Sequence, residues 1–124
     1  MKTERPVYLS LTQFAWPMSA IASITHRVTG VALFAAIAYL LWLLAVALES
    51  PAGFEHAGAL LEQPLPKLVM LAVLVALAYH LFAGIKHMVM DFHHLDTLEG
   101  GRNGAIVVFA ATLIAAAAAG VWLW

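Results

Sequence analysis

The hydrophobic positions of this chain fall into three long runs that polar segments separate. The first run follows Pro17, and the runs occupy approximately residues 19–48, 65–90 and 103–124. At about 1.5 Å per residue, helices of this length cross or nearly cross a hydrocarbon layer of about 30 Å. The pattern therefore predicts an all-α integral membrane protein with three transmembrane helices, which form a single membrane-anchor domain over residues 1–124.

Two polar segments connect the predicted helices. The first, from Glu49 to Lys67, contains three glutamates together with proline and glycine, and we expect it at the membrane interface, partly as a short surface helix.

The basic residues predict how the chain is oriented in the membrane, because Lys and Arg near span ends are enriched on the cytoplasmic side. All basic residues except Lys67 precede the first run, lie in its first turns or flank the second connection: Lys2, Arg5, Arg27, Lys86 and Arg102. The N-terminus and second connection are predicted in the cytoplasm, the first connection and C-terminus outside.

Composition excludes several classes of function. The chain is 64% hydrophobic and 10% charged, so its 124 residues leave no room for a separate soluble catalytic domain. It has no cysteine, which excludes disulfides, c-type haem attachment and cysteine-ligated iron–sulfur clusters within this chain. A net charge of -1 with scattered basic residues argues against nucleic-acid binding. The lack of an Arg- and Ser-rich presequence favours a bacterial inner-membrane protein.

Two histidines on the second predicted helix are candidates for chemistry. A charged side chain within a membrane costs about 2.5 kcal/mol or more, so ionisable residues there usually have a function. His80 lies in the apolar zone, where a neutral imidazole either ligates haem b or hydrogen-bonds a neighbouring helix. His87 shares its face but lies roughly 10 Å further along the axis, so the two cannot ligate one iron. His26 lies nearer the surface, so a second axial ligand is expected from a partner subunit.

Antiparallel packing of the first two helices is expected to bring six polar residues to one membrane face: Ser23, His26, Arg27, Lys86, His87 and Asp91. Haem propionates at this depth would meet His26 and Arg27, with His87 at the edge. Ser23, Arg27 and Asp91 offer a hydroxyl, a cation and a carboxylate, the groups that quinone reduction needs. For Arg27 taken alone, contact with lipid phosphates is the favoured interpretation. No catalytic residue is predicted.

Three segments together closely resemble the cytochrome b556 membrane-anchor subunit family of succinate dehydrogenase. They are Arg5-Pro6-Val7, the pattern S-x-x-H-R-x-[ST]-G over residues 23–30, and the pattern H-x-x-x-G-I-[RK]-H-x-x-x-D over residues 80–91. The two longer patterns lie in this order on the first two predicted helices, and together they are highly specific. The family commonly has arginine where this chain has Lys86.

The resemblance implies a respiratory complex of the tricarboxylic acid cycle. A flavoprotein with FAD oxidises succinate, an iron–sulfur subunit relays electrons, and a second, smaller anchor subunit completes the helical bundle around haem b and the ubiquinone site. By the same resemblance, His80 is one haem ligand and the second anchor supplies the other. Ser23 and Arg27 are quinone-site residues, Asp91 lies near that site, and His26 and Arg27 lie close to the propionates.

Other functions fit parts of this pattern. The chain could be a fumarate reductase-type anchor, or a structural anchor without a role in electron transfer. A small transporter subunit would be expected to show inverted repeats or broken spans, which the sequence lacks. His56, His93 and His94 are assigned to no site.

Overall fold

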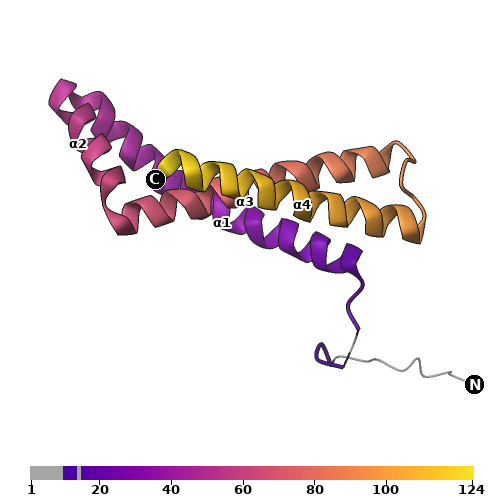
Figure 1. The fold of residues 1–124 in the computed structure, drawn as a ribbon. Coiled ribbons are helices and arrows are strands. Elements are labelled where there is room, and N and C mark those ends of the chain that lie inside the picture. Colours follow the sequence, from indigo (N-terminus) through magenta and orange to yellow (C-terminus); the bar gives the residue numbers. More distant parts are fainter. Residues whose placement is uncertain (1–9, 14) are drawn as a thin grey trace, which may run out of the picture.

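The computed structural model describes residues 10–13 and 15–124, and this part of the chain contains four helices and no strand (Figure 1). The helices are α1 (Met18–Glu49), α2 (Pro51–Glu62), α3 (Pro64–Asp91) and α4 (Leu98–Leu123). The most apolar windows of α1, α3 and α4 have mean hydropathies of 2.6, 2.4 and 2.4. The predicted all-α membrane fold with three long apolar helices is therefore confirmed. Lys2 and the Arg5-Pro6-Val7 segment lie outside the described residues.

Side-chain caps determine where two of the helices begin. The Ser50 hydroxyl accepts a hydrogen bond of 3.0 Å from the Gly53 amide, and Pro51 follows at the first helical position of α2. The Thr97 hydroxyl accepts one of 2.9 Å from the Gly100 amide. Because of this second cap, α4 begins at Leu98, before the apolar run that marked its start in the sequence.

Most of the first connection is helical. A methyl group at Gly53 would collide with the Val46 carbonyl oxygen, so glycine permits the close approach of α2 to the end of α1. Ala57 is buried at this contact, whereas Glu55 and His56 are exposed. The expectation of a short helix in this connection is therefore confirmed over nearly its full length.

The three long helices lie side by side and α2 covers one end (Figure 1). The N-terminal end of α1 and the turn between α3 and α4 lie at one end of the molecule, and α2 and the C-terminus lie at the other. Tyr79, Ala83 and Val108 form the buried core between α3 and α4, with Phe82 and Phe109 packed around them. This arrangement places the first half of α1 beside the second half of α3.

The core is small for a chain of this length. In the most apolar window of α1, 0% of the residues are buried, and the corresponding shares for α3 and α4 are 11% and 6%. The phenol of Tyr79 joins α3 to α1 by donating a 2.8 Å hydrogen bond to the Ala22 carbonyl. Most apolar side chains are consequently free to face lipid or the helices of another subunit.

Candidate functional site

A cavity of about 610 Å³ opens between α1 and α3. Five of the polar residues selected from the sequence line it: Ser23, His26, Arg27, His80 and His87. The remaining wall is mostly apolar and includes Leu81, Ile85 and Met88. A mainly apolar cavity with a few convergent polar groups is the usual form of a small-molecule or cofactor site.

The His80 ring is held in one orientation by α1. Its Nδ1 lies 3.1 Å from the His26 carbonyl oxygen and 3.2 Å from the Thr29 hydroxyl oxygen. The carbonyl can only accept, so Nδ1 carries the proton in this arrangement. The Thr29 hydroxyl lies 2.9 Å from the carbonyl oxygens of both Thr25 and His26, to which it can donate while its oxygen accepts from Nδ1. The other nitrogen, Nε2, therefore keeps its lone pair.

The three cavity histidines form a continuous contact. The His26 and His80 rings are stacked, with centroids 4.1 Å apart and planes 19° apart, and the His87 ring centroid lies 5.1 Å from that of His26. Gly30 makes room for this arrangement, because a Cβ atom there would lie 3.1 Å from Cε1 of His80. The backbone of α1 can therefore approach the imidazole of α3 closely.

Lys86 does not line the cavity of these polar groups, and its predicted place at the same membrane face stays a prediction. Lys86 is only 6% exposed and lines a different cavity, between α3 and α4. The reason is helix geometry, since successive residues are rotated by about 100°, and His87 already faces α1. Asp91 ends α3, is exposed, and does not line the cavity of His80, so its place in a quinone site stays a prediction.

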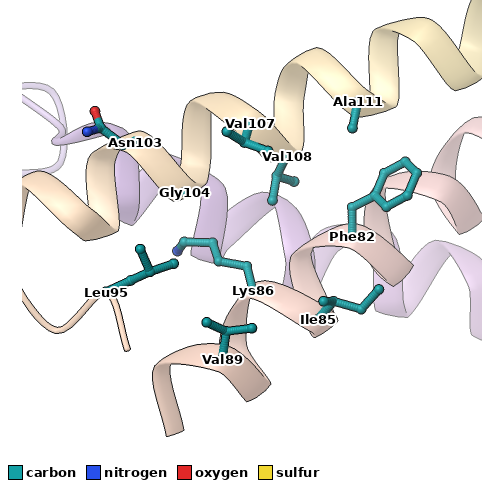
Figure 2. Close-up of a pocket in the computed structure, with 10 residues that line it drawn as sticks. All are labelled: Phe82, Ile85, Lys86, Val89, Leu95, Asn103, Gly104, Val107, Val108 and Ala111. Carbon is teal, nitrogen blue, oxygen red and sulfur yellow. The ribbon is translucent and has the colours of Figure 1, made fainter. Parts of the chain in front are cut away.

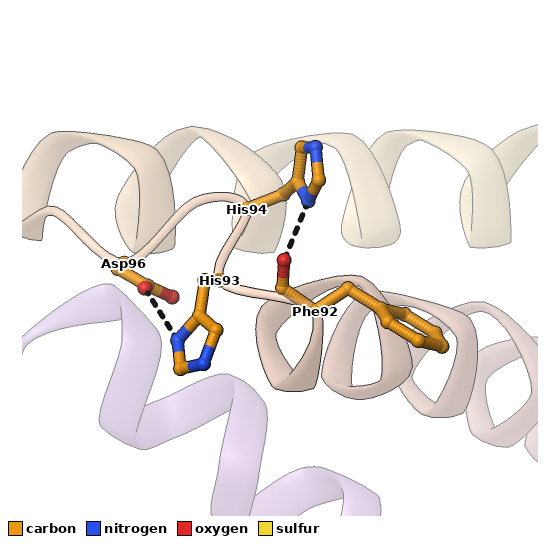
Figure 3. Close-up of polar contacts among 4 residues, drawn as sticks. All are labelled: Phe92, His93, His94 and Asp96. Carbon is orange, nitrogen blue, oxygen red and sulfur yellow. Dashed lines mark hydrogen bonds and ion pairs between the residues drawn. The ribbon is translucent and has the colours of Figure 1, made fainter.

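The remaining histidines lie away from the cavity. In the turn before α4, His93 is paired with Asp96 at 3.3 Å, and Nδ1 of His94 lies 2.8 Å from the Phe92 carbonyl oxygen (Figure 3). The backbone of His93 is left-handed, with φ of 59°, and this helps reverse the chain direction. The His93 and His94 side chains therefore each make a polar contact within the turn between α3 and α4.

Sequence reasoning gave no role to Thr29 or Gly30, although both belong to the pattern over residues 23–30. The sequence feature that could have identified them is their spacing from His26. Thr29 and Gly30 follow His26 by about one helical turn, so a hydroxyl and a glycine lie on the same side of the helix as His26. That spacing became informative only when the structure placed His80 against the same face. These two residues support the His80 ring and do not line the cavity.

The described part of the chain contains no group of three or more His, Cys, Asp or Glu side chains that could hold a metal ion. Residues 10–13 and 15–124 therefore do not provide the set of three or more side-chain ligands that a zinc or calcium site of the usual type requires. An oriented single imidazole instead suits a metal whose other positions are filled by a macrocycle.

Comparison with known proteins gives consistent matches. The family model described as succinate dehydrogenase/fumarate reductase transmembrane subunit matches residues 1–119. A succinate dehydrogenase cytochrome b556 subunit from Coxiella burnetii (strain RSA 493 / Nine Mile phase I) is 41% identical over 125 residues, which cover 100% of both chains. The subunit of that name from Paracoccus denitrificans is 31% identical over 90% of this chain and 86% of its own. A mitochondrial cytochrome b560 subunit from Sus scrofa is 30% identical, over 90% and 68% respectively.

Proposed function

Because this chain belongs to the succinate dehydrogenase/fumarate reductase transmembrane subunit family, we propose that it binds haem b through His80 and helps form a ubiquinone-reduction site. The chain is a multi-pass membrane protein, and its relatives are subunits of an oxidoreductase complex. The observation that carries the proposal is the hydrogen bonding of His80, whose Nδ1 is satisfied by α1 while Nε2 keeps a lone pair.

The residues around His80 fit haem b. Leu81, Ile85 and Met88 supply apolar wall for a porphyrin, and Arg27 supplies a fixed positive charge for a propionate at the polar part of the cavity. A hydrogen bond from the ring nitrogen opposite the metal fixes the tautomer of a ligating histidine and raises its basicity. Bound there, haem would supply a one-electron carrier inside the membrane.

In this proposal, a further ligand of haem b would come from another chain. An imidazole coordinates through the lone pair in the plane of its ring. The His26 and His80 rings are stacked face to face with centroids 4.1 Å apart, so their in-plane lone pairs do not point at each other across a shared metal position. A histidine of the second, smaller anchor subunit would complete the coordination, with the flavoprotein and iron–sulfur subunits supplying electrons from FAD and iron–sulfur clusters.

Ser23 and Arg27 are the groups proposed for the quinone. Both line the cavity near the start of α1, where a lipid-soluble molecule can enter from the membrane. The Ser23 hydroxyl and Arg27 guanidinium can donate to carbonyl oxygens that gain negative charge during reduction. Asp91 is proposed to act nearby on the basis of the family resemblance. A bacterial inner-membrane location completes this proposal.

A structural anchor without electron transfer is the competing function, and a reduced-minus-oxidised optical spectrum separates the two. In the purified complex, His80→Ala is expected to abolish or strongly alter a low-spin b-type spectrum, because an axial bond is lost. Succinate oxidation by a soluble artificial acceptor should persist. His56→Ala is the matched control, because His56 is exposed on α2 and far along the chain from the cavity. An unchanged spectrum and haem content in an assembled His80→Ala complex would refute the ligand assignment.

A further inference from the structure

Lys86 is buried on the face of α3 that meets α4. Only 6% of the residue is exposed, and its stem lies over the backbone of α4, with Cε 3.3 Å from the position that a Cβ on Gly104 would occupy. A charged side chain within a membrane-spanning helix normally has a partner of opposite charge. Among the described residues, the structure shows neither an ion pair nor a hydrogen bond of the Lys86 amine.

The amine is nevertheless within reach of a ligand. In the described part of the chain, no side-chain nitrogen or oxygen is both fully enclosed and without a hydrogen-bond partner. The unpaired Nζ atom must therefore remain accessible at its tip. The stem is covered by α4, and Lys86 is among the residues that line the cavity of about 350 Å³ between α3 and α4.

The exposed lining of this cavity is almost entirely apolar, and its two residues with polar side chains, Lys86 and Asn103, lie toward one end (Figure 2). Lys86 lies five residues before the end of α3, and Asn103 lies five residues after the start of α4, so both are about 7.5 Å from the turn. Phe82, Val108 and Ala111 lie deeper, toward the middle of the helices. The end with Lys86 and Asn103 is thus at headgroup depth, and the end with Phe82 and Ala111 is at acyl-chain depth.

The rim of the cavity is apolar and open. Ile85 is 50% exposed and Val107 is 64% exposed, which in a membrane-spanning helix pair is a surface that lipid chains cover. A carboxylate on a partner helix could neutralise Lys86 but would not by itself fill the apolar end. A phospholipid does both, since its phosphate pairs with the ammonium while an acyl chain follows the groove.

We propose that the cavity between α3 and α4 is a binding site for an anionic phospholipid of the phosphatidylglycerol class. The phosphate pairs with Lys86 at the cytoplasmic end, and one acyl chain lies along Phe82, Val108 and Ala111. The site is separate from the histidine cavity, because the two share only Ile85 among their lining residues.

A photoreactive phosphatidylglycerol with a diazirine on one acyl chain tests the proposal on the detergent-purified complex that contains this chain. Peptide mapping should place the label within residues 82–111. Lys86→Met is expected to reduce labelling about fivefold, the effect of one basic residue near an anionic headgroup. Lys86→Arg should retain it. Lys67→Met is the matched control, because its amine lies over the Trp124 ring at 5.2 Å, at the opposite end of α3.

Two further arms keep the result decisive. Ala111→Phe fills the apolar end without changing the charge and should also reduce labelling, and it serves if Lys86→Met fails to assemble. A phosphatidylcholine probe of the same chain length should label this site more weakly, because its choline group already neutralises the phosphate. Equal labelling of wild type and Lys86→Met, equal labelling by the two lipids, or crosslinks from residues 82–111 only to another protein would each overturn the proposal.

Discussion

The orientation of one imidazole depends on residues that do not line the cavity. The Nδ1–H of His80 donates to the His26 carbonyl and the Thr29 hydroxyl oxygen of α1, and Gly30 leaves space for the ring. Such supporting contacts commonly affect metal affinity by about 10-fold to 100-fold. The same α1 segment therefore both lines the cavity and selects the His80 tautomer.

Thr29→Val removes the hydroxyl while keeping the shape of the side chain nearly unchanged. Because the His26 carbonyl remains as a partner of His80, we expect haem affinity to fall by about tenfold, the lower end of the range for supporting contacts. Haem retained during serial dilution of the purified complex measures this. Thr25→Val is the control, since the Thr25 hydroxyl donates to Ile21 at 2.8 Å and has no hydrogen bond with His80. Equal haem loss from both variants would contradict a specific role for Thr29.

At the scale of helices, the sequence predicted which segments are helical and how long they are. It predicted less well how each helix is rotated about its own axis, and so which side chains face a neighbouring helix. Long apolar runs identified the three spans, because a helix must satisfy its backbone hydrogen bonds internally in lipid. All-round hydrophobicity, however, does not show which face of a membrane helix meets a neighbour. Ser23, His26, Arg27, His80 and His87 meet at one cavity because they share the α1–α3 interface, whereas Lys86 turns toward α4. The Thr97 cap likewise extends α4 beyond its apolar run.

Tyr79→Phe tests the hydrogen-bonded contact between α3 and α1. The lost hydrogen bond, 2.8 Å to the Ala22 carbonyl, is buried, and we expect the free energy of unfolding to fall by about 0.6–1.5 kcal/mol. Unfolding in mixed micelles with increasing dodecyl sulfate provides the measurement. Tyr39→Phe is the matched control, because its hydroxyl lies 3.3 Å from the Pro66 carbonyl and is only partly buried. If Tyr39→Phe costs as much as Tyr79→Phe, the contact has no special importance.

The whole molecule has two chemically different ends. The turn between α3 and α4 lies at the same end as the start of α1, and α2 lies with the C-terminus at the other (Figure 1). Arg102 and Arg27 belong to the first end, whereas the exposed Glu55 belongs to the second. Because basic residues near span ends remain in the cytoplasm, the fold predicts that the histidine cavity opens near the cytoplasmic face, where a soluble electron donor can approach.

The absence of cysteine from the sequence allows this orientation to be tested one position at a time. Glu55→Cys on α2 and His94→Cys in the α3–α4 turn each introduce a single thiol at an exposed residue. In intact spheroplasts, a membrane-impermeant maleimide should label the Glu55→Cys chain, and it should label the His94→Cys chain only after permeabilisation. The labelled chain is identified by its mass. The reverse pattern would place the His80 cavity near the outer face, and electrons from a cytoplasmic donor would then have to cross most of the bilayer to reach it.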